Sequence, residues 1–426
     1  MRLRLDVLAV AATIAVSGCG RAQPVPEPAP PAEAPKVFTP RPLREIVVAR
    51  TPERVERGRY LSEGLLQCFV CHSERDWKKP GAPPIPALKG AGQVWPGRPW
   101  LTAPNLTPDK ETGTGTWTDD MQIRAIREGI SHDGRVLHPQ MWYRSFGILP
   151  DEDVESVVAY LRSLKPIKHA LPKTNIPPDE AKKLEVPKPI TEPVPMPPQP
   201  ATDVDRGRRL AWLADCSGCH TSWYTPKNPG LFGGGNLITR GDLKTYGANI
   251  TSDDSGIKHY DATFFREVMR TGKARGRELS PLMPWTVFKN LNDQDLDGLF
   301  AYLSELPKVK HIIDNIDKPT KCAICGGEHP LGQYNRPVEL KLVPVPLDEL
   351  KDAPGTYRFE AGFEVRIAIE AGKLNVKFDG GGCELVTTDR KTYFCQGEIE
   401  RIEFVRDTAG KITGMLNILE PGKKIR

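Results

Sequence analysis

Apolar residues recur at helical spacing in the first three quarters of the chain. The clearest case is the stretch 151–164, whose apolar residues fall three or four positions apart and therefore share one helical face. These residues are Val154, Val157, Val158 and Leu161. The same reading predicts helices over 52–66 and 118–129, whereas the Gly- and Pro-rich stretch 73–101 is predicted to be loop.

From about residue 348 the pattern changes to strict alternation, which is typical of strands with one buried face. The predicted strands are 355–359, 363–369, 373–378 and 399–405. We therefore expect a small all-β domain over 348–426, either a barrel or a meander. Its Gly355-Thr356-Tyr357 start and its 403–407 and 410–414 segments resemble the β-domain appended to some exported penicillin-binding-like serine hydrolases. Because no nucleophile and base accompany them, a docking or structural role is predicted.

Two Pro-rich segments divide the chain and account for many of its 42 prolines. Residues 19–45 are predicted to form an extended tether, and residues 167–200 to form a linker. Met196 lies among the prolines of this linker and is not expected to reach an iron.

The segments on either side of the linker repeat one another. Arg57-Gly58-Arg59 matches Arg206-Gly207-Arg208, Asn105-Leu106-Thr107 matches Asn249-Ile250-Thr251, and Ala159-Tyr160-Leu161 matches Ala301-Tyr302-Leu303. The offset falls slowly from 149 to 142 along the repeat. Such a drift indicates a duplicated domain with small loop deletions. The predicted modules are 46–166 and 201–308, followed by a Cys-containing connector at 309–347.

Each module carries the motif Cys-x-x-Cys-His, at 68–72 and again at 216–220. This motif attaches c-type haem: two thiols bond to the porphyrin and the adjacent imidazole binds the iron. We therefore predict two covalently attached haem c groups. Disulfides or zinc knuckles would not explain a His directly after both second cysteines. The predicted attachment residues are Cys68, Cys71, Cys216 and Cys219, and the predicted proximal ligands are His72 and His220.

The repeat also selects candidates for the second axial position of each iron. Met283, in Leu-Met-Pro-Trp, corresponds to Met141 at the offset of 142. Module one differs in carrying Trp142 where module two has Pro284. His138, whose counterpart is Ser280, is the rival ligand in module one. We expect the remaining histidines without a partner in the repeat to lie at the surface: His132, His169, His259 and His311.

The order of these motifs resembles class I cytochrome c, and in particular the multi-haem cytochrome subunits of membrane-bound alcohol and gluconate dehydrogenases. The resemblance covers about 250 residues, the two modules. It implies a mainly α fold, two tandem class I cytochrome c modules followed by the β-domain. It also implies an electron carrier between a periplasmic or membrane dehydrogenase and a respiratory acceptor, such as an oxidase or another cytochrome. Those subunits commonly have three haem modules, whereas this chain has two.

Two other functions stay open at this stage. A dihaem peroxidase or thiosulfate-oxidising enzyme would need one open iron, for which module one's departure from Met-Pro is the only support. A binding protein whose haems sense redox state would use the β-domain to recognise its partner. Because 59 Lys and Arg nearly balance 54 Asp and Glu, the chain has no general reason to bind nucleic acid.

The first 18 residues read as a secretory signal, with Arg2 and Arg4 before an apolar run. The run is too short to span a bilayer comfortably. The following Val-Ser-Gly-Cys resembles the bacterial lipobox, which predicts lipidation of Cys19. By the same resemblance Gly20 favours the outer membrane. We therefore expect a lipid-anchored protein of the bacterial periplasm.

Four cysteines remain: Cys322, Cys325, Cys383 and Cys395. A third haem at Cys322 and Cys325 is excluded because Gly326 stands where the His must be. Disulfides are the first interpretation for an exported chain, with Cys383 and Cys395 stapling one hairpin. The alternative is a zinc site that combines His329 and the Cys322–Cys325 pair with Cys383 and Cys395.

Overall fold

The computed structural model describes residues 39–182, 184, 188–200, 202–336, 341–359, 363–378, 381–395, 401–417 and 421–425. The predicted signal, Cys19 and the tether up to residue 38 lie outside these residues. Within the described ranges, no helix has the length and apolar character needed to cross a membrane.

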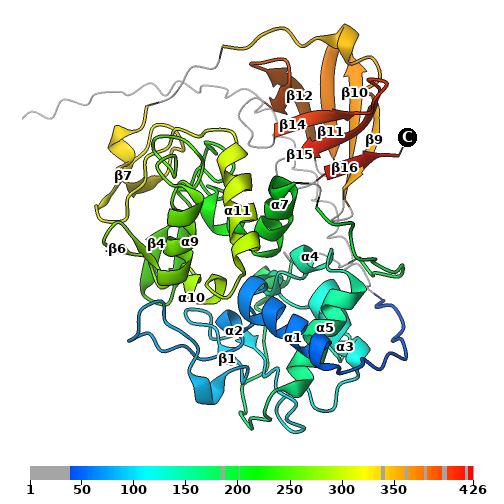
Figure 1. Cartoon of the computed structure of the whole chain (residues 1–426), viewed down its shortest axis with the longest axis vertical. Helices are drawn as coiled ribbons and strands as arrows, with labels where there is room; N and C mark the ends of the chain where they lie inside the picture. Colours follow the sequence, from blue (N-terminus) through cyan, green and yellow to red (C-terminus); the bar gives the residue numbers. More distant parts are fainter. Residues whose placement is uncertain are drawn as a thin grey trace, which may run out of the picture. The chain divides into compact units, whose positions relative to one another are not determined.

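The first module is built around helices α1 (Pro52–Tyr60), α3 (Asp119–Glu128) and α5 (Asp151–Ser163), close to the three predicted helices. The predicted helix 52–66 is not uniform, because a π-helical segment, η1 (Leu61–Leu65), continues α1. The short helix α2 (Cys68–Cys71) follows it and carries the first cysteine motif. Figure 1 shows α1 and α5 packed side by side.

The second module repeats this arrangement with α7 (Asp203–Leu213), α8 (Cys216–His220), α9 (Ala262–Thr271) and α11 (Asp293–Glu305). Helix α7 packs on α11 as α1 packs on α5. The glycine of the repeated Arg-Gly-Arg motif explains this packing. A Cβ atom on Gly58 would lie 1.8 Å from the Ser156 carbonyl oxygen, and one on Gly207 would lie 1.9 Å from that of Gly298. Only glycine permits such close helix contact.

Shorter elements complete the two modules and the connector. The helical ones are η2 (Pro86–Leu88), η3 (Pro139–Met141), α4 (Tyr143–Phe146), α6 (Pro178–Ala181), α10 (Trp285–Phe288), η4 (Gly332–Tyr334) and η5 (Leu347–Glu349). The strands form four antiparallel pairs: β1 (Gln93–Val94) with β2 (Thr102–Ala103), β3 (Leu237–Arg240) with β4 (Leu243–Tyr246), β5 (Lys273–Ala274) with β6 (Arg277–Glu278), and β7 (Pro319–Lys321) with β8 (Glu328–Pro330).

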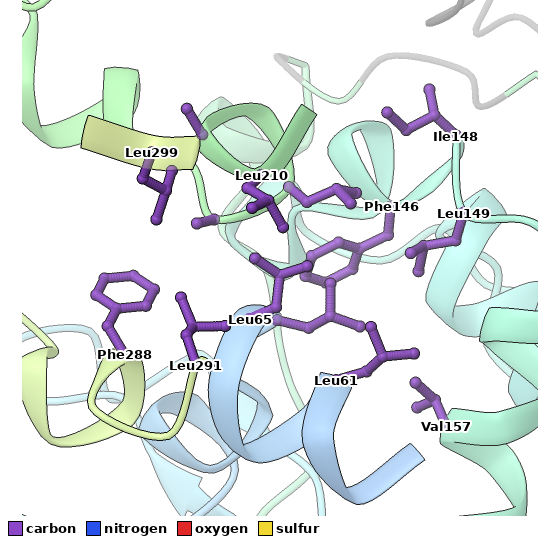
Figure 2. Close-up of a cluster of buried hydrophobic side chains, with 14 of the residues drawn as sticks. Leu61, Leu65, Phe146, Ile148, Leu149, Val157, Leu210, Phe288, Leu291 and Leu299 are labelled. Atoms are coloured by element: carbon purple, nitrogen blue, oxygen red, sulfur yellow. The ribbon is translucent and has the colours of Figure 1, made fainter. Parts of the chain in front are cut away.

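The two modules share one hydrophobic core. Figure 2 shows Leu61 and Leu65 from the first module beside Leu291 from the second, with Phe146 and Leu210 completing the cluster. Leu61 and Leu291 are each only 1% exposed. Because these side chains exclude water jointly, the modules are packed against each other and are not simply joined by a flexible linker.

Parts of the predicted tether and linker also pack on the first module. The buried Arg41 guanidinium pairs with Asp120 at 2.7 Å and with Glu128 at 2.8 Å. In the linker, the Asn175 amide donates to the Trp100 carbonyl at 2.8 Å. The described residues near these segment ends therefore belong to the folded body of the module.

The C-terminal domain is a closed eight-stranded antiparallel barrel, so the predicted all-β domain is confirmed and the barrel is chosen over the meander. Its strands, labelled in part in Figure 1, are β9 (Gly355–Phe359), β10 (Glu364–Glu370), β11 (Lys373–Phe378), β12 (Gly381–Thr387), β13 (Thr392–Cys395), β14 (Arg401–Arg406), β15 (Ile412–Asn417) and β16 (Pro421–Lys424). Closure comes from pairing of β16 with β9, as in Lys424 opposite Tyr357. Inside, Tyr357, Ile367 and Met415 are almost completely buried.

Candidate haem-binding sites

The first cysteine motif lies on α2, in the wall of a cavity of about 520 Å³. Cys68 and Cys71 are both unpaired thiols. His72 is 5% exposed, and its Nδ1 lies 2.8 Å from the carbonyl oxygen of Pro104. A carbonyl can only accept, so Nδ1 carries the proton and Nε2 keeps a free lone pair. Burial lowers the pKa of His72, which favours the neutral imidazole that binds iron.

The second motif repeats this geometry on α8. Cys216 and Cys219 are unpaired, and His220 Nδ1 lies 2.8 Å from the carbonyl oxygen of Ala248. Burial also lowers the pKa of His220. The residue before each motif adopts the left-handed conformation, with φ of 55° at Gln67 and 50° at Asp215. This conformation is unusual for residues with a side chain, so its presence in both modules marks a shared turn into the attachment helix.

A second repeated turn holds the carbonyl that orients each imidazole. The Asn105 side-chain oxygen accepts from the Thr107 amide at 2.9 Å, and Asn249 does the same for Thr251 at 3.0 Å. Pro104 and Ala248 directly precede these asparagines. The Asn-x-Thr repeat was visible in the sequence, but its role was not, because the contact to His72 spans 32 residues.

Each cavity also contains the methionine predicted from the repeat. Met141 ends the turn η3 and lines the first cavity together with His72. Met283 lines the second cavity, of about 1390 Å³, together with His220. The rival His138 lines both cavities, and its Nδ1 accepts a hydrogen bond from the Gln140 amide at 3.1 Å. Thiols, an oriented imidazole and a thioether are therefore gathered around each cavity, which is the donor set that a c-type haem uses.

Two buried arginines that sequence reasoning missed lie between the modules. Arg240 donates to the Val70 carbonyl at 3.3 Å, inside the first cysteine motif, and Arg75 donates to the Pro281 carbonyl at 2.8 Å. Arg75 and Arg240 are 6% and 7% exposed, and burial lowers the pKa of both guanidinium groups. Within the described ranges neither pairs with a carboxylate, and Arg240 Nε has no hydrogen-bond partner. Buried cations of this kind fit an anionic group bound in the cavity, such as a haem propionate.

The family model for cytochrome c matches residues 55–165 and 204–307, which together make up just over half of the chain. This chain belongs to the cytochrome c family. Covalently bound haem c is accordingly its cofactor, and the two matched regions coincide with the two cysteine motifs.

Several relatives of this cytochrome c are cytochrome subunits of dehydrogenases. It is 31% identical over 270 residues to the gluconate 2-dehydrogenase cytochrome c subunit of Pantoea cypripedii, covering 59% of each chain. It is 30% identical over 273 residues to the fructose dehydrogenase cytochrome subunit of Gluconobacter japonicus, covering 59% of this chain and 52% of that one. A third relative, at 30% identity over 114 residues, is the alcohol dehydrogenase (quinone) cytochrome c subunit of Gluconobacter oxydans, with 26% of this chain and 22% of that one covered. The chain thus spans between about half and three-fifths of the length of the first two relatives.

Several predictions outside the haem cavities need correction. His132 and His259 are exposed as expected, and His169 is half-buried, but His311 is completely buried. Cys383 and Cys395 form a disulfide between β12 and β13, as predicted, so they are not available as zinc ligands.

The predicted disulfide between Cys322 and Cys325 is wrong, because both thiols are free and buried. The repeat-based reasoning missed His311 because this histidine has no counterpart in the first module.

Proposed function

We propose that this cytochrome c carries two haems and passes electrons from a membrane or periplasmic dehydrogenase to a respiratory acceptor. The observation that carries the proposal is the duplicated site. Each module brings two free thiols, an imidazole with its Nδ1 held by a carbonyl, and a methionine to one cavity. Haem iron supplies a one-electron couple when bound there.

The residues of each module would divide the work in the same way. Cys68, Cys71, Cys216 and Cys219 would hold the porphyrin as thioethers. His72 and His220 would bind iron through Nε2, because their Nδ1 atoms are occupied. Met141 and Met283 would occupy the sixth coordination position of each iron. A closed position suits electron transfer because the iron then has no site open for exchange of an axial ligand.

Direct contact between the two attachment segments supports electron transfer from one haem to the other. Gln67, next to Cys68, donates from Nε2 to the Ala214 carbonyl at 2.8 Å. Arg240 reaches the Val70 carbonyl from the other module. Moreover, the larger cavity is lined by Cys71 as well as by Cys216 and Cys219. The shared core keeps this arrangement fixed, which favours electron transfer with little rearrangement.

Dehydrogenase cytochrome subunits among the relatives favour a dehydrogenase as the electron donor. The signal and lipobox-like sequence favour a periplasmic protein anchored by lipid at Cys19, with Gly20 favouring the outer membrane. The acceptor would be an oxidase or a soluble cytochrome. An enzyme with one open iron is not favoured, since both cavities contain a methionine in register.

The test uses full-length protein matured in a host that attaches haem. Haem is counted per chain, and the ferric protein is studied by electron paramagnetic resonance. We expect two haems, both low-spin with His/Met character. The paired variants Cys68→Ala/Cys71→Ala and Cys216→Ala/Cys219→Ala should each retain one haem.

One haem in the native chain, or a stoichiometric high-spin signal that reacts with peroxide, would contradict the proposal. Anchoring is tested separately, by mass spectrometry of the N-terminal peptide and by membrane fractionation of a Cys19→Ala variant.

A further inference from the structure

Four metal-binding side chains meet outside both haem cavities, in the connector after the second module. They are His311, Cys322, Cys325 and His329, and one donor atom from each lies within 4.8 Å of all the others. None is more than 1% exposed. The strands β7 and β8 form a hairpin that brings Cys322, Cys325 and His329 together, and His311 joins them from the preceding segment.

The two imidazoles are oriented for a shared cation. His311 Nδ1 lies 2.9 Å from the Gly233 carbonyl oxygen, and His329 Nδ1 lies 3.0 Å from that of Pro330. Both Nδ1 atoms must therefore donate, and each neutral ring presents only a lone pair at Nε2. These two Nε2 atoms face each other at 2.9 Å. Two facing lone pairs repel, and a proton between them would leave an uncompensated charge in a fully buried place.

The sulfur atoms complete a set of four donors. Cys322 Sγ lies 3.5 Å from His311 Nε2. Zinc bonds of about 2.0 Å to nitrogen and 2.3 Å to sulfur at a tetrahedral angle place such atoms about 3.5 Å apart. The Cys325 amide approaches Cys322 Sγ at 3.5 Å, and the Gly327 amide approaches Cys325 Sγ at 3.4 Å. Amide groups directed at sulfur stabilise thiolates, the form in which cysteine binds metal.

We propose that His311, Cys322, Cys325 and His329 bind one structural zinc ion. Two thiolates and two neutral imidazoles neutralise a divalent cation, so the buried site carries no net charge. Nitrogen and sulfur donors in tetrahedral geometry select zinc among the common divalent ions. The site offers four protein ligands and is closed to water, which indicates a structural role. This inference does not depend on the proposed electron-transfer function.

The position of the ion explains what it would stabilise. His311 is hydrogen-bonded to Gly233, and the Lys227 amide donates to the Cys325 carbonyl at 2.9 Å. Both partners belong to the loop that follows the second cysteine motif. In the same loop, the Gly234 amide donates to the carbonyl of His220, the predicted iron ligand, at 2.8 Å. Zinc would therefore fasten the connector to the loop beside the second haem.

The test measures zinc and iron in the full-length holoprotein purified without added metal. We expect one zinc per chain, whatever the haem content, and X-ray absorption at the zinc edge should give two nitrogen and two sulfur neighbours. The variant Cys322→Ser/Cys325→Ser should lose at least nine-tenths of the zinc. The matched control, Cys383→Ser/Cys395→Ser, removes the two cysteines of the barrel disulfide. This control variant should keep its zinc.

The native protein decides the question even if the first variant fails to fold. Three results would each overturn the proposal. They are a Cys322–Cys325 disulfide found by mass spectrometry, less than a tenth of an equivalent of zinc, and iron bound in place of the zinc in addition to the haem iron. Zinc with only oxygen and nitrogen neighbours would also overturn it.

Discussion

The close contact between helices α7 and α11 at Gly207 predicts that a larger residue at this position destabilises the second module. Replacing it by alanine would place a methyl carbon 1.9 Å from the Gly298 carbonyl oxygen, 2.5 Å from its carbonyl carbon and 2.7 Å from Tyr302 Cβ. Most of these atoms are backbone, so no side-chain rotation relieves the clash. Helices α7 and α11 must move apart by about 1.5 Å to restore an ordinary contact.

The expected cost of Gly207→Ala is about 3 kcal/mol of unfolding free energy, at the upper end of the range for overpacked cores. This outweighs the gain of up to about 1 kcal/mol that alanine normally brings to a helix. Because α7 leads directly into the second cysteine motif, the potential of one haem should shift as well. Denaturant unfolding followed by circular dichroism, together with a redox titration, measures both effects.

Gly64→Ala is the matched control. A Cβ atom there would lie 3.4 Å from Leu291 Cδ2, an ordinary contact beside the same core. We expect its stability to be unchanged or slightly increased. If the unfolding free energy of Gly207→Ala lies within about 0.5 kcal/mol of that of the native protein, the close-packing explanation of the repeated glycine is refuted.

Three further predictions concern the haem sites. Met141→Ala and Met283→Ala should each lower one haem potential and produce a high-spin signal, whereas His138→Ala should leave both spectra unchanged; the reverse result would assign His138 as ligand. Arg240→Gln should lower a potential in redox titration, because a buried positive charge disfavours the ferric state; an unchanged value would contradict its placement beside haem. Burial raises the pKa of Asp215 to about 7, and the ferric state favours its carboxylate, so one potential should fall as pH rises through this region. Asp215→Asn should remove that slope, and a slope that persists would assign the proton to another group.

Local motifs predicted the haem sites better than they predicted the connections between distant residues. The spacing of Cys216, Cys219 and His220 requires only one short helical turn, and the repeat placed Met283 by register. In contrast, His311 is buried against Gly233 and His329. No repeat or periodic pattern in the sequence indicates that these residues meet. A histidine without a counterpart was therefore assigned to the surface.

The same distinction holds for the fold. Alternation predicts strands, but barrel closure depends on pairing between β9 and β16, which lie at opposite ends of the domain sequence. Likewise, Leu65 and Leu291 are plainly apolar, yet the sequence does not indicate that they would meet across two modules. The Pro-rich segment between the modules was predicted only to be a linker, and it left open how firmly the two modules pack.

The joint core also has a consequence for how the chain matures. Leu61 and Leu65 pack against Phe146 within their own module, but Leu291, more than 200 residues later in the chain, is needed to complete their burial. Before the second module is in place, part of the apolar surface of the first module is therefore open to solvent or to a chaperone. The duplicated halves have become mutually dependent, and a fragment cut in the Pro-rich segment would be expected to aggregate.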